Sequence, residues 1–328
     1  MKIGYVFSNL LMGGLQSIFS EFANGFSKNN EVKYTVFDMN LADPILLKRL
    51  SSIEYLSKSD LLKWSDIIFF DGMLSNEEKQ FFKPKWKRTI EYLGSRRKYS
   101  LRQKILKTNL SPNIIAQSKD ISDNLGVKNR IIYIGKDTNW FRPLKLDKKY
   151  DLAIIGRMRP VKNHKLFLDI CKAGGFTFAT IGGTHRRLEG HVNDIEKLAR
   201  SHARPEIDYV PGFISDEEML KVINQTRIGL VVSNSVGAPE GTEFMSCGVP
   251  TIVRDVGAAA ELHRNEYPDL ILPFDASIKE WVERIRKYLN DTNLSYRVRE
   301  TILNSFSRDK TLNQFEKLFN TIIERNPI

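Results

Sequence analysis

The sequence predicts an α/β protein with two doubly wound, Rossmann-like domains. Short apolar strands alternate with helical segments from end to end, a pattern that favours parallel sheets with crossover helices. The 328 residues exceed the roughly 150 residues of a typical domain. A polar, lysine-rich stretch at 142–151 interrupts the alternation. We therefore expect two domains joined near residue 147, each with its own core.

Each half of the chain contributes a series of short apolar runs that read as buried strands. The expected strands of the first half are 2–8, 32–38, 65–71, 87–93, 113–118 and 130–135, and those of the second are 152–156, 176–182, 207–212, 228–234, 250–255 and 269–274. Helical segments fall between them. One is 15–28, in which apolar residues recur at intervals of three and four.

The carboxyl end, from Ile278 to Arg325, reads almost entirely as helix. Such a tail could pack back onto the first domain and tie the two halves around a cleft. We therefore predict a first domain at 1–145, a second domain at 146–310, and a C-terminal helix at 311–328 that returns to the N-terminal domain.

Composition bounds the class of protein. Hydrophobic residues make up 41% and charged residues 27%, which is typical of a globular chain, and no run approaches the ~18 apolar residues of a membrane span. The amino terminus lacks a small-residue cleavage site. Cys171 and Cys247 lie in apolar or helical contexts that suit buried thiols in a reducing compartment. We expect a soluble, cytoplasmic protein.

The formal charge of +11 predicts an anionic partner, and it is concentrated in one segment. Ten basic residues and one acid lie between Lys83 and Lys107, with aromatic residues interleaved. The candidate surface residues are Lys85, Trp86, Arg96, Arg97, Lys98 and Arg102. They suit an anionic membrane surface that carries a lipid-linked or polysaccharide acceptor, and equally a nucleic acid. A solvated basic face without a ligand is the third alternative.

Open α/β sheets bind ligands at the carboxyl ends of their strands, so the loops there carry the candidate chemistry. Gly13 and Gly14 follow the first strand and would let a ligand approach the backbone, or simply form a tight turn. A second strand ends at Gly156 and is followed by Arg157 and Lys162. A guanidinium and an ammonium could neutralise a diphosphate, although loops often carry such cations in solvent.

The segment GAPEGTEFMSCGVP holds two glutamates three residues apart. Pro239 suits the first position of a helix, which would place Glu240 and Glu243 in its first turn and let Gly248 end it. Carboxylates at a helix start are stabilised by its dipole, so these residues alone predict either a helix start or a site for a sugar nucleotide.

Taken in order, these motifs resemble the GT-B glycosyltransferases of the large retaining family 4, among the group 1 glycosyltransferases. The strand, Arg157 and Lys162 come first, then YVPGFISDEEML at 209–220, then the glutamate helix that runs into Cys-Gly-Val-Pro. YIGKDTNWFRP at 133–143 resembles the family's linker signature, and DVGAAAELHRN at 255–265 its Gly-Gly-x-x-Glu loop. The resemblance covers nearly the whole chain.

The resemblance implies a nucleotide-diphosphate sugar, UDP- or GDP-linked, held by the second domain. Arg157 and Lys162 would contact the diphosphate, and Glu243 would bind the ribose hydroxyls as the second glutamate of the family's Glu-x7-Glu motif. The remaining donor-side residues would be Gly13, Gly14, Gly156, Gly212, Ser235, Gly257 and Ala258. Ser235 stands where the family has its first glutamate, so we expect Glu240 to substitute from one turn away, unless the sugar is held differently or catalysis is lost.

The implied reaction is a front-face displacement in which the departing diphosphate helps to take the acceptor proton. No Asp-x-Asp motif follows a strand and no His/Cys cluster has ligand spacing, so we predict no cofactor and no metal. We favour a cell-surface, polysaccharide or lipid-linked acceptor, with the enzyme peripheral at the inner face of the membrane.

Three other functions remain open from the sequence. A phage-type enzyme that glycosylates a modified DNA base would use the basic segment for phosphate contacts. A nucleotide-sugar epimerase is disfavoured because every histidine, from His164 to His263, lies in the second half. A non-catalytic binding module is compatible with Ser235.

Overall fold

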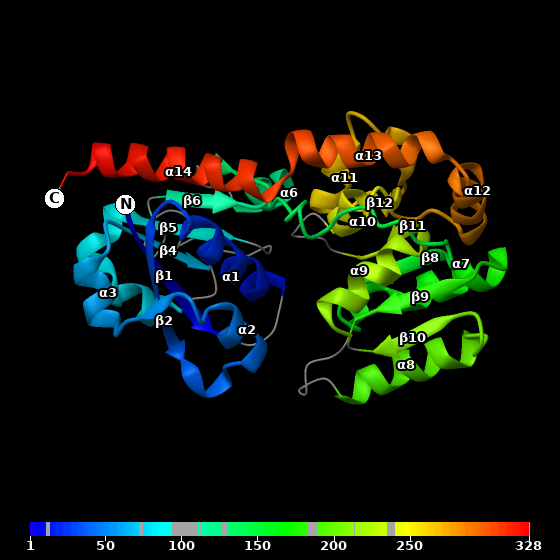
Figure 1. Ribbon diagram of the computed structural model, residues 1–328, viewed down its shortest axis with the longest axis horizontal. Helices are drawn as coiled ribbons and strands as arrows, with labels where there is room; N and C mark the ends of the chain where they lie inside the picture. The colour runs from blue at the N-terminus through cyan, green and yellow to red at the C-terminus, as the bar shows by residue number, and fades with distance from the viewer. Residues whose placement is uncertain are drawn as a thin grey trace. The chain divides into compact units, whose positions relative to one another are not determined.

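The computed structural model divides into two compact units (Figure 1), of which unit 1 joins Met1–Ile134 to Arg308–Ile328 and unit 2 is Gly135–Ser307. The residues that the structure describes are 1–10, 14–71, 75–93, 111, 113–125, 130–182, 189–212, 214–234 and 240–327. Each unit contains one parallel sheet with flanking helices. The predicted α/β class with two parallel sheets is confirmed.

Unit 1 is built on a seven-stranded sheet of order β3-β2-β1-β4-β5-β6-β7. Its strands are β1 (Lys2–Asn9), β2 (Glu31–Asp38), β3 (Glu54–Tyr55), β4 (Ile67–Asp71), β5 (Thr89–Leu93), β6 (Asn113–Ala116) and β7 (Arg130–Ile131). Every pair of neighbours is parallel. The strand order reverses between β1 and β4, so the sheet is doubly wound.

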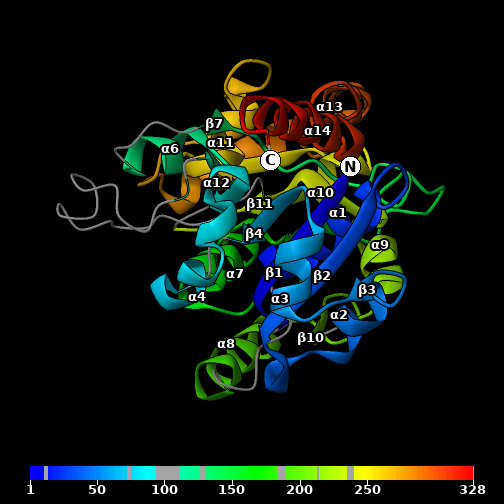
Figure 2. The ribbon, with the colours of Figure 1, turned by 90° about the vertical axis from the view of Figure 1, so that its left-hand side faces the viewer.

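Helices cover both faces of this sheet. They are α1 (Gly14–Phe26), η1 (Met39–Leu41), α2 (Pro44–Arg49), α3 (Lys58–Trp64), α4 (Asn76–Phe81), η2 (Lys83–Arg88), α6 (Lys119–Leu125) and α14 (Arg308–Arg325). Because side chains of a strand alternate between faces, Tyr5 packs on Phe19 of α1 with ring centroids 5.7 Å apart, while Val6 packs in a cluster with Leu61 of α3 on the opposite face. Figure 2 shows α1 and α3 with the first strands of unit 1.

The C-terminal helix α14 belongs to unit 1. Phe315 lies 5.1 Å from Phe69 of β4 between ring centroids, and Phe319 lies 5.4 Å from Phe26 of α1. At the end of the chain, Arg88 Nε donates to the carbonyl oxygen of Asn326 at 2.7 Å. Aromatic packing and this hydrogen bond therefore hold the last helix against the first sheet.

Unit 2 has a six-stranded parallel sheet of order β10-β9-β8-β11-β12-β13. Its strands are β8 (Tyr150–Ile155), β9 (Phe178–Ile181), β10 (Tyr209–Gly212), β11 (Thr226–Val231), β12 (Thr251–Arg254) and β13 (Ile271–Leu272). The order reverses between β8 and β11, so this sheet is also doubly wound.

The two faces of this sheet form separate cores. The helical segments are η3 (Pro160–Lys162), α7 (His164–Gly174), α8 (Glu189–His202), α9 (Asp216–Asn224), α10 (Thr242–Ser246), α11 (Gly257–His263), η5 (Pro268–Leu270), α12 (Ile278–Tyr288) and α13 (Thr292–Ser305). Ile154 is buried with Phe167 of α7 and Trp281 of α12. Ala153, its neighbour in β8, is buried on the other face with Ile223 of α9 and Phe244 of α10.

The division between the units falls at Ile134 and Gly135, earlier than the sequence suggested, and recurs between Ser307 and Arg308. The lysine-rich stretch at 142–151 is attached to unit 2. Leu144 N donates to Asn224 Oδ1 at 2.7 Å, and Lys148 Nζ donates to the carbonyl oxygen of Thr226 at 2.8 Å. These hydrogen bonds make the stretch an edge of the second unit.

Several predicted strands are shorter in the structure, and one strand was not predicted. The expected strand 130–135 is reduced to Arg130–Ile131, and 269–274 to Ile271–Leu272. The strand β3 was missed because Glu54 and Tyr55 are exposed and give no apolar run. No helix in the described part of the chain has the length and apolar character needed to cross a membrane.

Candidate functional site

The charged side chains of unit 2 gather where β8 and β11 end. These two strands are neighbours at the reversal of strand order, and a crevice forms outside the carboxyl ends of strands at such a point. The loop after β8 carries Arg157 and Lys162, and the loop after β11 leads to Glu240 and Glu243. The architecture therefore brings together the cations and acids that the sequence singled out separately.

Two glycines let the loops after β8 and β9 approach each other. Gly182 has a φ of 153°, and a Cβ atom there would lie 1.9 Å from the carbonyl oxygen of Gly156. No other residue fits this position without moving the backbone. Gly156 itself lies beside the aliphatic stem of Lys162, 3.4 Å from where its own Cβ would stand. Gly182 is a site-forming residue that the sequence reasoning missed.

Lys162 and Glu240 form an ion pair at this point. Their side chains are 18% and 20% exposed, so both reach solvent while remaining mostly covered. Ser233 Oγ donates to Glu240 Oε2 at 2.8 Å, which fixes the carboxylate just beyond the end of β11. The sequence analysis selected Lys162 and Glu240 for separate roles and predicted neither their pairing nor the contact with Ser233.

Glu240 does not lie in the helix that the sequence predicted. The helix α10 begins at Thr242, and Gly241 is its N-cap residue with a φ of 89°. A Cβ at Gly241 would lie 2.7 Å from Thr251 Cγ2, so a glycine is needed there. The prediction that Glu240 and Glu243 share the first turn is wrong, since only Glu243 is helical. Pro239, the predicted first residue, lies outside the described residues.

Glu243 pairs with a lysine that the sequence reasoning did not select. Lys136 Nζ lies 2.7 Å from Glu243 Oε1, and the two side chains are 12% and 19% exposed. Lys136 belongs to the 133–143 segment, close to where the chain enters unit 2, and its backbone N–H donates to the carbonyl oxygen of Phe306 at 3.0 Å. The sequence signal that could have identified Lys136 is its positive charge within the segment YIGKDTNWFRP, which resembles the family's linker signature.

Burial and mutual repulsion alter the cations of this cluster. The pKa of Lys162 is lowered to about 8, first because burial disfavours the ammonium and then because Arg157 repels it, while Glu243 acts in the opposite direction. The pKa of Arg157 is lowered by desolvation and by Arg159, although its side chain reaches solvent. The cations of this site are partly desolvated and repel one another. An anion bound among them would reduce this repulsion.

A neutral histidine lies beside the cations. His164, the first residue of α7, is 1% exposed, and burial together with the charge of Lys162 lowers its pKa to about 4. Its ring is uncharged at neutral pH, so it adds no further positive charge next to Lys162. The sequence analysis gave His164 no role in the site and mentioned it only as the first histidine of the second half.

A hydrogen-bonded network fixes the Lys162 loop to the end of β11. Asn234 N donates to the carbonyl oxygen of Val161 at 2.7 Å, and its side-chain oxygen accepts from Asn163 Nδ2 and from Arg254. Asn163 has a φ of 54°, in the left-handed region that asparagine tolerates better than most residues. Hydrogen bonds between Asn234 and the residues on either side of Lys162, Val161 and Asn163, therefore hold the loop in the conformation observed.

The other predicted donor-side residues lie at strand ends and helix starts. Gly257 and Ala258 form the first turn of α11, directly after β12, where amide groups lack partners within the helix. Gly212 ends β10, and Gly14 begins α1 in unit 1. Gly13 and Ser235 lie outside the described residues.

The predicted basic surface is described only in part. Lys85 Nζ donates to the carbonyl oxygens of Lys63 and Ser65, and burial lowers its pKa. Trp86 is partly buried and stacks on Phe70, with ring centroids 6.4 Å apart. Both side chains thus contribute to the packing of unit 1. Arg96, Arg97, Lys98 and Arg102 lie outside the described residues.

The metal-ligating residue types do not cluster in the described ranges. No group of three or more His, Cys, Asp or Glu side chains there is placed to hold a metal ion. The two cysteines, Cys171 and Cys247, are buried and unbridged, and burial raises the pKa of each thiol.

The fold and the site together define a class: an α/β protein with two doubly wound units, whose second unit gathers cations and carboxylates at its switch point. Residues 135–304, nearly all of unit 2, match the family model described as glycosyl transferases group 1. The chain belongs to this family. The resemblance to group 1 glycosyltransferases with a GT-B fold is therefore confirmed at the level of family and fold class.

Solved structures agree on the fold. The glycosyltransferase from Rickettsia africae ESF-5 has a TM-score of 0.81 at 15% identity, with 99% of each chain covered. Anabaena Alr3699/HepE in complex with UDP and glucose has a TM-score of 0.78 at 14% identity, with 98% of this chain and 100% of that chain covered. Sucrose-phosphate synthase from Thermosynechococcus elongatus has a TM-score of 0.76 at 14% identity, with coverage of 99% and 100%. No curated protein matches the sequence.

Proposed function

We propose that this protein is a retaining, metal-independent glycosyltransferase that uses a nucleotide-diphosphate sugar as donor. The observation that carries this proposal is the meeting of Lys162, Glu240 and Glu243 at the β8–β11 switch point in a member of the group 1 family. One solved protein of the same fold, Anabaena Alr3699/HepE, has been crystallised in complex with UDP and in complex with UDP and glucose. We therefore expect a UDP-linked donor, with a GDP-linked donor as the second choice.

The donor diphosphate would lie against the loop after β8. Four cations belong to this cluster, and two carboxylates accompany them: Lys136, Arg157, Arg159 and Lys162 with Glu240 and Glu243. The excess of positive over negative charge suits a diphosphate. Because the ammonium of Lys162 is already partly desolvated, its attraction for a phosphate oxygen is stronger than in open solvent.

Glu243 would bind the ribose. A carboxylate can accept hydrogen bonds from both hydroxyls of a vicinal diol. Lys136 Nζ lies 2.7 Å from one carboxylate oxygen of Glu243. Ribose would then share or replace this contact, which makes Lys136 a residue that tunes donor affinity.

Glu240 would take the role of the acid that the family places eight residues before Glu243. Its support by Ser233 and its pairing with Lys162 hold a carboxylate beside the diphosphate cations. In this position the carboxylate of Glu240 would accept a hydrogen bond from a hydroxyl of the donor sugar. The contact with Lys162 also keeps that ammonium directed to the same point.

The reaction follows from these roles. The bond between the sugar anomeric carbon and the diphosphate oxygen breaks, and an acceptor hydroxyl oxygen forms the new bond on the same face. The acceptor proton passes to the departing diphosphate, which takes the bonding electrons. Lys162 and Arg157 neutralise the charge that develops on this leaving group, so the protein acts by positioning and electrostatics.

The acceptor we propose is a polysaccharide or lipid-linked glycan at an anionic surface. The net charge of +11 supports an anionic partner. Retention on anionic liposomes, weakened by salt, would agree with this proposal. Salt-sensitive retention on plain duplex DNA, without retention on liposomes, would favour a DNA acceptor instead.

Incubation with a panel of sugar nucleotides, beginning with UDP-glucose, tests the reaction class. A slow release of free sugar from one donor, lost in Lys162→Ala, is the expected result. Interconversion of sugars would identify an epimerase. Binding without release or interconversion would identify a non-catalytic module.

A further inference from the structure

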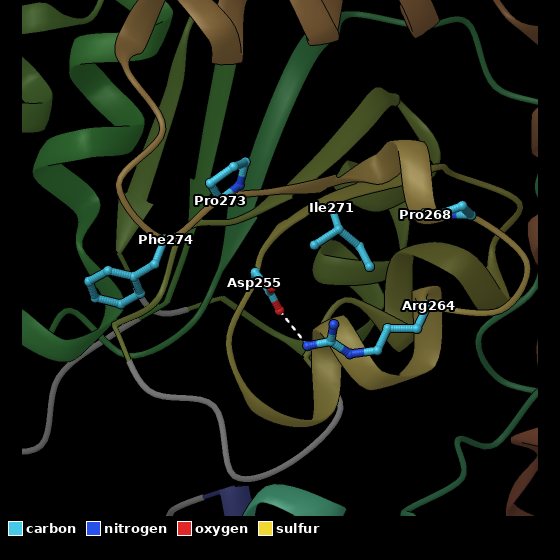
Figure 3. Close-up of a pocket in the computed structure, with 6 residues that line it drawn as sticks. All are labelled: Asp255, Arg264, Pro268, Ile271, Pro273 and Phe274. Atoms are coloured by element: carbon cyan, nitrogen blue, oxygen red, sulfur yellow. Dashed lines mark hydrogen bonds and ion pairs between the residues drawn. The ribbon is translucent and has the colours of Figure 1, made fainter.

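A pocket in unit 2 lies outside the Lys162 cluster, along the β12–β13 edge of the sheet (Figure 3). Its volume is about 580 Å³, within the range of roughly 300–1,000 Å³ of small-ligand sites. The lining residues are Asp255, Arg264, Pro268, Ile271, Pro273 and Phe274. None of them has a role in the proposed donor site, so any ligand of this pocket would be recognised by a separate set of side chains.

One end of the pocket is an aromatic ring that is exposed and yet held in place. Phe274 is 49% exposed. The guanidinium of Arg254 lies 3.8 Å from the ring centroid, and Arg254 Nε donates to the carbonyl oxygen of Phe274 at 2.5 Å. A ring fixed in this way can receive a flat apolar surface with little further loss of conformational freedom. Pro273, next to it, has its φ fixed by the proline ring.

The rest of the pocket adds a paired acid and base. Arg264 donates to Asp255 at 2.5 Å, and the two side chains are 55% and 40% exposed. An exposed pair of this kind contributes little to stability, so a ligand can share its hydrogen bonds at little cost. In Figure 3, Ile271 lies between this pair and the prolines.

We infer that this pocket binds carbohydrate. A sugar ring offers a face of C–H groups, which suits Phe274, and an edge of hydroxyls that donate to a carboxylate and accept from a guanidinium. A free phosphate would meet the carboxylate of Asp255 as well as the guanidinium of Arg264, and a purely apolar ligand would cover this pair without offering it any further hydrogen bond, which is costly. Because its lining side chains are exposed, the pocket suits a segment of an oligosaccharide chain.

The pocket is connected to the proposed donor site through one side chain. Arg254, which stacks on Phe274, also donates to Asn234, and the backbone N–H of Asn234 donates to Val161 next to Lys162. A glycan held against Phe274 would thus be one side chain, Arg254, away from the network that fixes the Lys162 loop. If the protein is a glycosyltransferase, as proposed above, the oligosaccharide bound in this pocket is part of the acceptor or of the product.

The test is binding of the full chain to an array of oligosaccharides of neutral hexoses, amino sugars and uronic acids, followed by calorimetry with the best-bound one. Phe274→Ala and Arg264→Gln should each weaken binding roughly tenfold, and Phe274→Trp should retain it. Tyr296→Ala is the matched control, because Tyr296 is 70% exposed on α13 of the same unit and does not line the pocket. It should leave binding unchanged.

Absence of binding to every oligosaccharide would overturn the inference, as would binding that neither pocket variant weakens. Nucleotide binding that Phe274→Ala abolishes would also overturn it, by assigning the pocket to a base.

Donor hydrolysis separates this inference from the proposed function. If the reaction class is wrong but the pocket is right, no sugar nucleotide is hydrolysed while the glycan affinities still follow Phe274 and Arg264. Arg264→Gln should hydrolyse donor at the wild-type rate.

Discussion

Unit 1 and unit 2 each contain lysine–glutamate pairs, but in different surroundings. In unit 1, Lys79 Nζ lies 2.5 Å from Glu91 Oε1, and the side chains are 3% and 0% exposed. In unit 2, the pairs of Lys162 with Glu240 and of Lys136 with Glu243 lie at the ends of strands and retain access to solvent. A closed pair can only support the fold, whereas an accessible pair at a switch point can exchange its partner for a ligand.

Breaking the closed pair should have the largest effect on stability. Glu91→Gln leaves the ammonium of Lys79 without its carboxylate in the core of unit 1, which should lower the free energy of unfolding by about 3–5 kcal/mol. Chemical denaturation followed by circular dichroism measures this loss. Glu54→Gln is the control, because its exposed pair with Lys33 should contribute no more than about 1 kcal/mol. Equal losses in the two variants would contradict the contrast between closed and open pairs.

Removing Lys162 should affect turnover far more than stability. Lys162→Ala deletes a cation that acts on charge developing at the leaving group, so kcat for donor hydrolysis should fall roughly 100-fold. The melting temperature should change little, since burial of the charged side chain already opposes folding. A variant that loses its fold would show that Lys162 acts mainly on stability. A variant that keeps full turnover would show that Lys162 takes no part in the reaction.

The pH dependence of activity sharpens the same assignment. The pKa of Lys162 is lowered to about 8, so kcat/KM should fall as the pH rises through this value, because the ammonium is lost. Lys162→Arg should move this limb to higher pH. The stability effect has the opposite sign: above pH 8 the unfolded chain binds more protons at this lysine than the folded chain, so its contribution to stability rises with pH up to the unfolded value. An unshifted alkaline limb in Lys162→Arg would contradict the assignment.

The Lys136–Glu243 pair should control donor affinity. Glu243→Ala should raise the Kd for the sugar nucleotide roughly tenfold, by loss of hydrogen bonds to the ribose. Lys136→Met should change the Kd less, because it removes a neighbour of Glu243 and not the group that contacts the sugar. Calorimetry on both variants measures the difference. A larger effect from Lys136→Met would mean that the lysine itself is the main contact with the nucleotide.

The sequence predicted the architecture well, for a physical reason. Strands buried on both faces read as continuous apolar runs, as in KIGYVFS of β1 and LAII of β8, and parallel strands require the helices between them. The exposed strand at Glu54 and Tyr55 has no such run and was missed. The order of short motifs along the chain also indicated the family before any contact was known.

The partners of the site residues could not be read from the sequence. Lys136 and Glu243 are far apart along the chain, and only the folded structure, in which Lys136 N also donates to the carbonyl oxygen of Phe306, brings them together. Glu240 was assigned to a helix because Pro239 suits a helix start, but the left-handed Gly241 delays the helix to Thr242. Local preference proposed one start, and the packing of residue 241 against Thr251 selected another.

The central claim is that a donor diphosphate binds at the β8–β11 switch point of unit 2. A crystal structure of the protein soaked with UDP tests it most directly. We predict phosphate oxygens within hydrogen-bonding distance of Lys162 Nζ and ribose hydroxyls on the carboxylate of Glu243. A nucleotide bound elsewhere, with Glu243 still paired only to Lys136, would contradict the claim.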